Sequence, residues 1–236
     1  MLTQARLFLR GVKARSAQRR FIAREKPHSP GSTDWLIQRE IQYGGYVTNI
    51  PKKTASRMDP AKAGFLTGGD RMLTHGYAAT YAKHLARYLD TGEGLTLVEI
   101  GILNGTGLAI WCDLFEQARV IGLDIDPGNY YRNFEGLKLK GAFRRNQPEV
   151  FEFEQFKDNT AYLGGILQGT RIDIAIDDGC HADSAILSTL KSVIPHLAAH
   201  FVYFIEDNPS VHETIKHLHP EYAVENQGKL TVLTSC

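Results

Sequence analysis

Few folds accommodate a chain in which short apolar runs alternate with segments of helical period, as they do here from residue 76 onward. Strands that are apolar on both faces and separated by helices form a parallel sheet with helices on both sides. The pattern therefore predicts an α/β fold with a doubly wound, seven-stranded sheet. The expected strands are 95–100, 119–124, 151–155, 171–177, 201–205, 221–225 and 230–233. The expected helices are 76–89, 108–116, 159–167, 182–197 and 210–218.

The composition fits one such domain with additional material. The chain has 236 residues, of which 43% are hydrophobic and 22% are charged, and these fractions are typical of a globular protein rather than a disordered or fibrous one. No apolar run approaches the ~18 residues of a membrane-spanning helix. The three cysteines (Cys112, Cys180 and Cys236) are widely separated. They predict neither a disulfide framework nor a zinc site, so we expect a cytoplasmic protein.

Positive charge is concentrated at the N-terminus. Residues 1–26 hold eight Arg or Lys and one Glu, which gives this segment a charge of +7 in a chain whose net charge is +1. Such a segment is typical of transit peptides, of helices on anionic membrane surfaces, of arms that bind nucleic acid, and of helices that pack on the protein itself or on a second subunit. We favour packing, including packing in a homo-oligomer, and then peripheral membrane contact. Nucleic acid is not expected, because no recognition motif accompanies the charge.

The domain organisation follows from these shifts in composition. Residues 1–30 are expected to be a basic arm. Residues 31–72 are rich in Pro, Gly, Ser and Lys, with one amphipathic stretch at 34–42, and we expect them to form a helical cap or lid over the site. Residues 73–236 would form the main domain.

The loop after the first strand is rich in glycine, and residues 99–107 read EIGILNGTG. Glycine lets the backbone approach a ligand closely, and an acid at the end of the second strand can accept both hydroxyls of a ribose. A dinucleotide fingerprint has glycines at relative positions 1, 3 and 6, whereas here they fall at 1, 5 and 7, which disfavours NAD. The candidate cofactor contacts from this region are Glu99, Gly101, Asn104, Gly105 and Asp124.

Acidic residues also follow the fourth and fifth strands, at Asp177-Asp178-Gly-Cys-His181 and Glu206-Asp207-Asn208. Neighbouring parallel strands end at the same edge of a sheet, so these side chains should converge there. Carboxylate oxygens suit Mg²⁺, and a hydroxyl bound to the ion becomes more acidic. We therefore expect metal ligands and a general base at this edge. The expected ligands are Asp177, Glu206 and Asp207, with His181 as the base and Asp178 as a second catalytic candidate that could instead cap the following helix.

These motifs resemble those of the class I S-adenosylmethionine-dependent methyltransferases, and among them the metal-dependent sugar O-methyltransferases of the macrolide type. That group has Asp-Asp-Gly-Ser-His at strand four and Ile-Glu-Asp at strand five, and this chain departs from the first motif only at Cys180. The resemblance covers about residues 73–236. It implies a Rossmann-like sheet with an antiparallel last strand, S-adenosylmethionine as cofactor, and magnesium or a similar divalent cation.

The resemblance adds further candidates and some departures. The segment before strand one resembles a His-x-Tyr segment that helps to close the cofactor site, which makes Arg71 and His75 cofactor candidates. Near strand three the group has Gly-Asp-Gln, whereas here Gln155-Phe-Lys is followed by Asp158, a candidate for adenine. By analogy with catechol O-methyltransferase, Asn208 could replace Glu206 as the third ligand. The basic linker 127–148 is expected to be an exposed loop or a contact for an anionic acceptor.

The expected function is therefore magnesium-dependent transfer of a methyl group from S-adenosylmethionine to a sugar hydroxyl of a small molecule or glycan. Cephalosporin-hydroxylase-like proteins share these motifs, so a hydroxylase or another enzyme on that scaffold is an alternative. An NAD-linked oxidoreductase is disfavoured by the glycine spacing. From a different class, a non-catalytic module at a membrane surface would depend on the basic arm alone.

Overall fold

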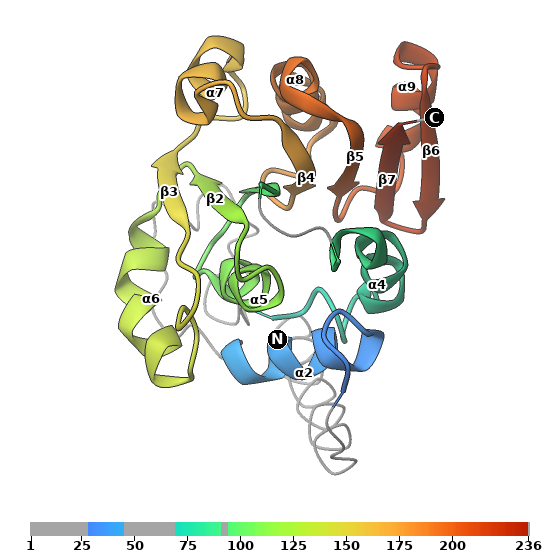
Figure 1. The fold of residues 1–236 in the computed structure, drawn as a ribbon. Coiled ribbons are helices and arrows are strands. Elements are labelled where there is room, and N and C mark those ends of the chain that lie inside the picture. The colour runs from blue at the N-terminus through green and yellow to red at the C-terminus, as the bar shows by residue number, and fades with distance from the viewer. Residues whose placement is uncertain (1–27, 45–68, 91–93, 236) are drawn as a thin grey trace, which may run out of the picture. The chain divides into compact units, whose positions relative to one another are not determined.

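The computed structural model describes residues 28–44, 69–90 and 94–235 (Figure 1). The chain divides into two compact units. Unit 1 comprises the described parts of Met1–Asp90, Leu103–Leu114 and Gly128–Arg145, and unit 2 those of Thr91–Ile102, Phe115–Pro127 and Asn146–Cys236. Residues 1–27 of the basic arm lie outside the described residues, as does most of the expected cap. The predicted domain boundaries therefore stay a prediction.

Unit 2 contains a seven-stranded sheet with the strand order β3-β2-β1-β4-β5-β7-β6. The first five strands run parallel, whereas β7 runs antiparallel to both β5 and β6. The order reverses between β1 and β4, and in such sheets ligands bind at the carboxyl ends of the strands beside this switch point. The predicted doubly wound sheet with an antiparallel last strand is confirmed. The strands are β1 (Thr96–Ile100), β2 (Arg119–Asp124), β3 (Glu149–Glu152), β4 (Ile172–Asp177), β5 (Leu197–Ile205), β6 (Tyr222–Gln227) and β7 (Leu230–Ser235).

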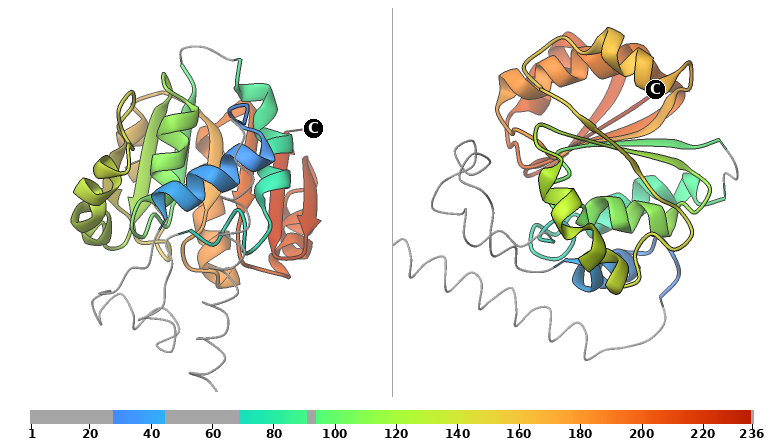
Figure 2. Two further views of the ribbon diagram at one scale, coloured as in Figure 1. Left: turned by 90° about the horizontal axis from the view of Figure 1, so that it is seen from below. Right: turned by 90° about the vertical axis from the view of Figure 1, so that its left-hand side faces the viewer.

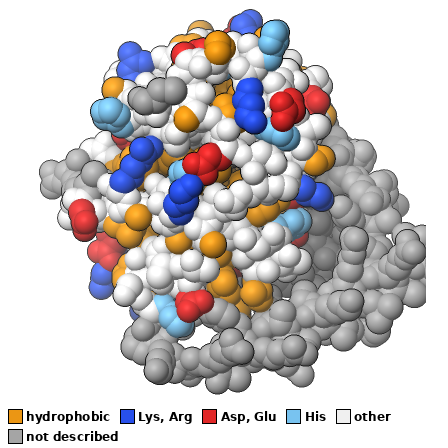
Figure 3. Space-filling model, turned by 90° about the vertical axis from the view of Figure 1, so that its right-hand side faces the viewer, with side chains coloured by type: hydrophobic (Ala, Val, Ile, Leu, Met, Phe, Trp, Pro, Cys, Tyr) orange, Lys and Arg blue, Asp and Glu red, His pale blue; other side chains and the backbone are white. Residues whose placement is uncertain are grey.

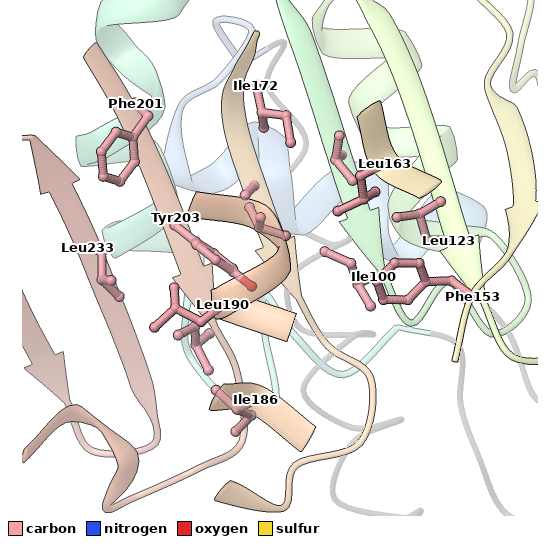
Figure 4. Packing of buried hydrophobic residues seen from close by; sticks show 14 of the residues in the cluster. Ile100, Leu123, Phe153, Leu163, Ile172, Ile186, Leu190, Phe201, Tyr203 and Leu233 are labelled. Atoms are coloured by element: carbon pink, nitrogen blue, oxygen red, sulfur yellow. The ribbon is translucent and has the colours of Figure 1, made fainter. Parts of the chain in front are cut away.

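Three helices cover one face of this sheet, α7 (Thr160–Leu167), α8 (Asp183–Val193) and α9 (Val211–Leu218) (Figures 1 and 2). Their apolar residues join those of the strands in one buried cluster, in which Ile186 and Leu190 of α8 lie near Tyr203 of β5 (Figure 4). Each fully buried side chain of this size stabilises the fold by about 1.5–3 kcal/mol. The cluster therefore holds β4 and β5 firmly, and with them the loops that follow these strands.

Unit 1 contains the helices α2 (Thr33–Tyr43), α4 (Ala78–Leu85), α5 (Thr106–Leu114) and α6 (Gly128–Leu139), and the short 3₁₀ helix η1 (Ala86–Tyr88). The helix α2 confirms the predicted amphipathic stretch. It begins where the Ser32 hydroxyl accepts a hydrogen bond from the amide of Trp35, and it buries Trp35 and Leu36. At its end the Lys140 ammonium donates to the carbonyls of Tyr43 and Gly44, which have no partners inside the helix.

Of the two alternatives for the linker at residues 127–148, the exposed loop is wrong, because the linker contains α6. Tyr130 and Leu137 on this helix are 3% and 0% exposed. Two of its basic side chains make contacts within unit 1, since Lys138 pairs with Glu135 and Arg132 donates to the side chain of Asn129. The apolar period of α6 rests mainly on aromatic residues among polar ones, which is why its sequence looks like a loop.

Several boundaries of the predicted helices and strands also differ from the prediction. The third strand ends at Glu152 rather than at Gln155, so Gln155 lies in the loop beyond it. The α8 helix ends at Val193, and a 3₁₀ turn, η2 (Ile194–His196), leads into a fifth strand that begins early, at Leu197. None of the helices in the described part of the chain is long and apolar enough to span a membrane.

Candidate active site

The pairing of β4 with β5 brings two acidic loops side by side. Asp177 and Ile205 form the last pair of the ladder, and the amide of Glu206 donates to the carbonyl of Asp177 at 2.9 Å. Beyond this point Asp178, His181 and Asp207 each present a ligand atom, and the three atoms lie within 4.8 Å of one another. Asp178 and Asp207 are half-buried and His181 is exposed, so this group can be reached from solvent.

Asp177 and Glu206 lie outside this group, and each is 2% exposed. Successive residues of a strand point to opposite faces, so Asp177 faces the same side as Ala175, a member of the cluster under the helices. Its Oδ1 accepts hydrogen bonds from Gln155 Nε2 at 2.9 Å and from the Gly179 amide at 3.3 Å. Burial raises the pKa of Asp177 to about 7, although these hydrogen bonds act to lower it.

The sequence leaves two alternatives open: Asp178 could cap the following helix, and Asn208 could replace Glu206 as a metal ligand. The N-cap residue of α8 is Ala182, so Asp178 does not occupy the cap position of this helix. Asn208 is buried, and its Oδ1 accepts hydrogen bonds from the amides of Ser210 and Val211 at the start of α9. This oxygen is therefore directed at the start of α9.

Gln155 lies beside the carboxyl end of β4, and the sequence did not indicate it as a site residue. Its Nε2 donates to Asp177 and to the Thr189 hydroxyl, and its Oε1 accepts from the Cys180 amide at 2.6 Å. A Cβ atom on Gly179 would lie 2.2 Å from Gln155 Oε1, so a larger residue there would displace the Gln155 side chain. The only signal in the sequence was an uncharged polar residue at the end of an expected strand. Gln155 thus holds the loop that carries Asp178 and His181.

The backbone of Asp207 is unusual, because its φ angle is 56°. This left-handed region costs a residue with a side chain roughly 1 kcal/mol, although Asp tolerates it better than most. The hydrogen bond from the Asn208 amide to the carbonyl of Lys229, at 3.1 Å, fixes the next residue of this turn. Strain of this kind is common at functional sites.

The turn after β1 directly contacts the loop that follows β4 and carries Asp178 and His181. Gly101 has a φ of 85°, and a Cβ atom there would lie 2.2 Å from the carbonyl oxygen of Asp178. The Asp178 amide in turn donates to the carbonyl of Ile100 at 2.8 Å. Gly101 is therefore needed for the close approach of two strand ends, a reason independent of any ligand.

Asp124 ends β2 with a well-oriented carboxylate. Its Oδ2 accepts from the Ile102 amide at 3.0 Å, and its Oδ1 accepts from the Asp126 amide at 2.9 Å. Glu99 on β1 is 1% exposed. Both acids therefore occupy fixed positions at the carboxyl edge of the sheet, as the sequence predicts.

The remaining candidates in unit 1 are held by local contacts. The side-chain oxygen of Asn104 accepts from the amide and hydroxyl of Thr106, and a Cβ on Gly105 would lie 2.5 Å from the ring of Tyr130. The Arg71 guanidinium lies over the rings of Tyr81 and Trp111, at 5.9 and 5.6 Å from their centres. His75 pairs with Asp70 at 3.3 Å.

Asp158 lies at the start of α7 in unit 2. Its Oδ1 accepts from the hydroxyl and the amide of Thr160, and its Oδ2 pairs with Lys191. The hydrogen bonds from Thr160 lower the pKa of Asp158 to about 2. These contacts join Asp158 to the start of α7 and to Lys191 of α8.

No family model matches this chain. It is 27% identical over 148 residues to 8-demethyl-8-alpha-L-rhamnosyl tetracenomycin-C 2'-O-methyltransferase of Streptomyces olivaceus, over 59% of this chain and 35% of that protein. It is 26% identical over 160 residues to mycinamicin VI 2''-O-methyltransferase of Micromonospora griseorubida, over 65% of this chain and 34% of that protein. The chain thus spans about a third of the length of the curated relatives that it matches.

Solved structures with the same fold include the MycE methyltransferase of the mycinamycin pathway in complex with Mg, SAH and mycinamycin VI. That structure has a TM-score of 0.51 and 17% identity, over 81% of this chain and 56% of MycE. A second MycE structure, with Mg and SAH, has a TM-score of 0.52 and 18% identity, over 80% of this chain and 55% of MycE. At this identity the likeness shows the fold alone. The chain therefore has the Rossmann-like fold of the class I methyltransferases, and its sequence is similar to those of sugar O-methyltransferases from natural-product pathways.

Proposed function

We propose that this chain is, or belongs to, a magnesium-dependent O-methyltransferase that transfers a methyl group from S-adenosylmethionine to a hydroxyl of a sugar. The observation that carries the proposal is the gathering of Asp178, His181 and Asp207 at the ends of β4 and β5, next to the turn at Gly101. The names of the sequence relatives support a sugar as acceptor, on a small molecule or a glycan.

The donor set fits a hard divalent cation. Asp178 and Asp207 would hold it through carboxylate oxygens, and Glu206 stays a candidate for a third ligand. The position of Asp177 in the interior favours Asp178 in its place. When bound, the cation polarises an oxygen of the substrate. Imidazole is a poorer ligand than carboxylate for magnesium, so we assign His181 the task of taking the proton from the acceptor hydroxyl.

Asp124 is proposed to accept the ribose hydroxyls of S-adenosylmethionine, because two backbone amides already orient its carboxylate. Glu99 and Gly101 would contact the methionine part of the cofactor, and Arg71, His75, Asn104 and Gly105 stay cofactor candidates. When bound, the cofactor supplies an electrophilic methyl group. The protein would hold the acceptor hydroxyl in line and remove its proton at His181, and most of the rate enhancement would come from this positioning.

The test is a reaction of the full chain with labelled S-adenosylmethionine, magnesium and a panel of sugar acceptors. The proposal predicts a product heavier by one methylene group, and it predicts loss of the reaction in excess chelator. A product heavier by one oxygen atom would instead support a hydroxylase. Full activity in chelator would overturn the metal dependence.

The basic arm is proposed to make peripheral membrane contact or to mediate self-association in a cytoplasmic protein. Its charge of +7 supports these proposals. On the described face in Figure 3, acidic and basic side chains are interspersed. Sedimentation with anionic vesicles, and the oligomeric state of the full chain compared with a chain lacking residues 1–26, would test both. Unchanged vesicle binding and unchanged mass in the shortened chain would contradict them.

A further inference from the structure

We propose that Asn208 is a positioning residue that fixes His181 relative to Asp178 and Asp207. This inference rests on the proposed role of His181. Asn208 directly follows Asp207 and is 4% exposed. Its side chain connects the loop after β4, which carries Asp178 and His181, with the loop after β5, which carries Asp207.

The amide group of Asn208 uses both of its ends. Its Oδ1 accepts from the amides of Ser210 at 2.9 Å and Val211 at 2.7 Å, as a helix-capping side chain does. Its Nδ2 donates to the carbonyl oxygen of His181 at 2.9 Å and to Asp183 Oδ1 at 2.7 Å. Because two neighbours are donors and two are acceptors, only one orientation of the amide satisfies all four contacts.

This set of contacts places His181 between two fixed elements. The carbonyl of His181 is bound to Asn208, and the amide of the preceding Cys180 is bound to Gln155. Asn208 is itself fixed at two points. Its backbone amide donates to the carbonyl of Lys229, and its side-chain oxygen accepts from the amide of Val211 at the start of α9. A shift of about 1 Å at a reacting group can cost 10²-fold in rate, so a residue that holds this loop should affect turnover without touching the substrate.

The variant Asn208→Asp separates positioning from helix capping. It keeps an oxygen for the amides of Ser210 and Val211, but it replaces the donor that faces the His181 carbonyl and the Asp183 carboxylate. We expect kcat to fall about 10- to 100-fold and the affinity for Mn²⁺, measured by electron paramagnetic resonance without substrate, to weaken by a similar factor. The KM for S-adenosylmethionine should change by no more than about twofold, since the loop at Asp124 is untouched.

The double variant Asn208→Asp/Asp183→Asn is the matched control. In it the new amide at position 183 can donate to the new carboxylate at 208, which restores that hydrogen bond with reversed polarity. The His181 carbonyl still lacks its donor. Thermal stability should therefore recover while kcat stays low, and Asp183→Asn alone should keep kcat within about twofold. Recovery of both stability and kcat in the double variant would reduce Asn208 to a structural residue and overturn the proposal.

Hydrogen exchange gives a readout that needs neither metal nor activity. In Asn208→Asp, amides of residues 178–182 should exchange faster, whereas those of α9 should stay protected because the cap remains. Faster exchange in α9 with an unchanged 178–182 segment would contradict the proposal. A wild-type chain without methyl transfer would refute the proposed function, and the exchange result would still decide whether Asn208 positions this loop.

Discussion

The carboxylate of Glu40 in unit 1 and the carboxylates of Asp178 and Asp207 in unit 2 differ in burial and in the groups that contact them. Glu40 in unit 1 is 2% exposed, and its two oxygens accept hydrogen bonds from the amides of Met72 at 2.7 Å and Leu73 at 3.0 Å. Asp178 and Asp207 in unit 2 are half-buried, and their oxygens gather near a ring nitrogen of His181. A buried carboxylate bound by amides holds a loop of its own chain, whereas gathered carboxylates repel each other unless a cation or a proton joins them.

The comparison also separates two adjacent residues. Asp177 resembles Glu40 in its burial and in the hydrogen bonds that its Oδ1 accepts from Gln155 and the Gly179 amide, although its Oδ2 is buried with no hydrogen-bond partner among the described residues. Asp178 belongs with Asp207. Two acidic residues that are adjacent in the sequence can therefore have different surroundings. The direction in which each side chain points determines which surroundings it has.

The largest expected effect concerns this adjacent pair. Asp178→Asn should lower kcat for methyl transfer on the order of a thousandfold, because a metal contributes several kcal/mol of charge stabilisation in the transition state. Asp177→Asn should lower it far less, since that residue acts on the loop from the interior. Steady-state kinetics at saturating magnesium measure both variants. A larger loss in Asp177→Asn would reverse the assignment.

The next effect is a pH dependence of stability that comes from Glu40. Burial raises the pKa of Glu40 from 4.5 to about 7, although the hydrogen bonds from Met72 and Leu73 lower it. The folded chain therefore holds this proton more tightly than the unfolded chain does. The contribution of Glu40 to the free energy of unfolding is greatest below pH 4.5, falls by about 3 kcal/mol as the pH rises to 7, and is constant above that.

Urea unfolding of the wild type and of Glu40→Gln between pH 5 and 8 tests this dependence. The variant cannot titrate at this position, so its stability should fall less steeply with pH. Titration of Asp177 also changes the free energy of unfolding with pH. This contribution is the same in both chains, so it cancels when the two pH profiles are subtracted. Parallel pH profiles for the two chains would show that Glu40 does not titrate in this range.

A smaller effect is expected at Gln155. The variant Gln155→Ala leaves Asp177 Oδ1 and the Cys180 amide each without one partner, which should lower the free energy of unfolding by about 1–3 kcal/mol. The matched control Thr189→Val removes a single neutral hydrogen bond from the same glutamine and should cost about 1 kcal/mol. Equal losses of unfolding free energy in both variants would mean that Gln155 does not hold the loop that carries Asp178 and His181.

The sequence predicts the sheet well because its central strands are apolar on both faces. The run from 119 to 124 matches β2 residue for residue, and the acids at 124 and 177 end their strands. The helix α6 is missed because its buried positions, Tyr130 and Leu137, lie among Asn, Gly and Lys, which are typical of loops. Periodicity detects helices only where the apolar stripe is continuous.

The details of the site are less accessible from sequence. A shift of one residue turns a side chain to the other face of a sheet, so the pair Asp177-Asp178 cannot be resolved without the register of β4. The tasks of Gln155 and Asn208 depend on partners 22 and 27 residues away in the sequence. No local pattern encodes such contacts.

An anomalous difference map from a crystal grown with Mn²⁺ and S-adenosylhomocysteine tests the central claim most directly. We predict one strong peak bound by the carboxylates of Asp178 and Asp207, with the ring of His181 facing it and Asp177 still bound to Gln155. A peak bound by Asp177, or full occupancy by Mn²⁺ elsewhere with these carboxylates apart, would contradict the account.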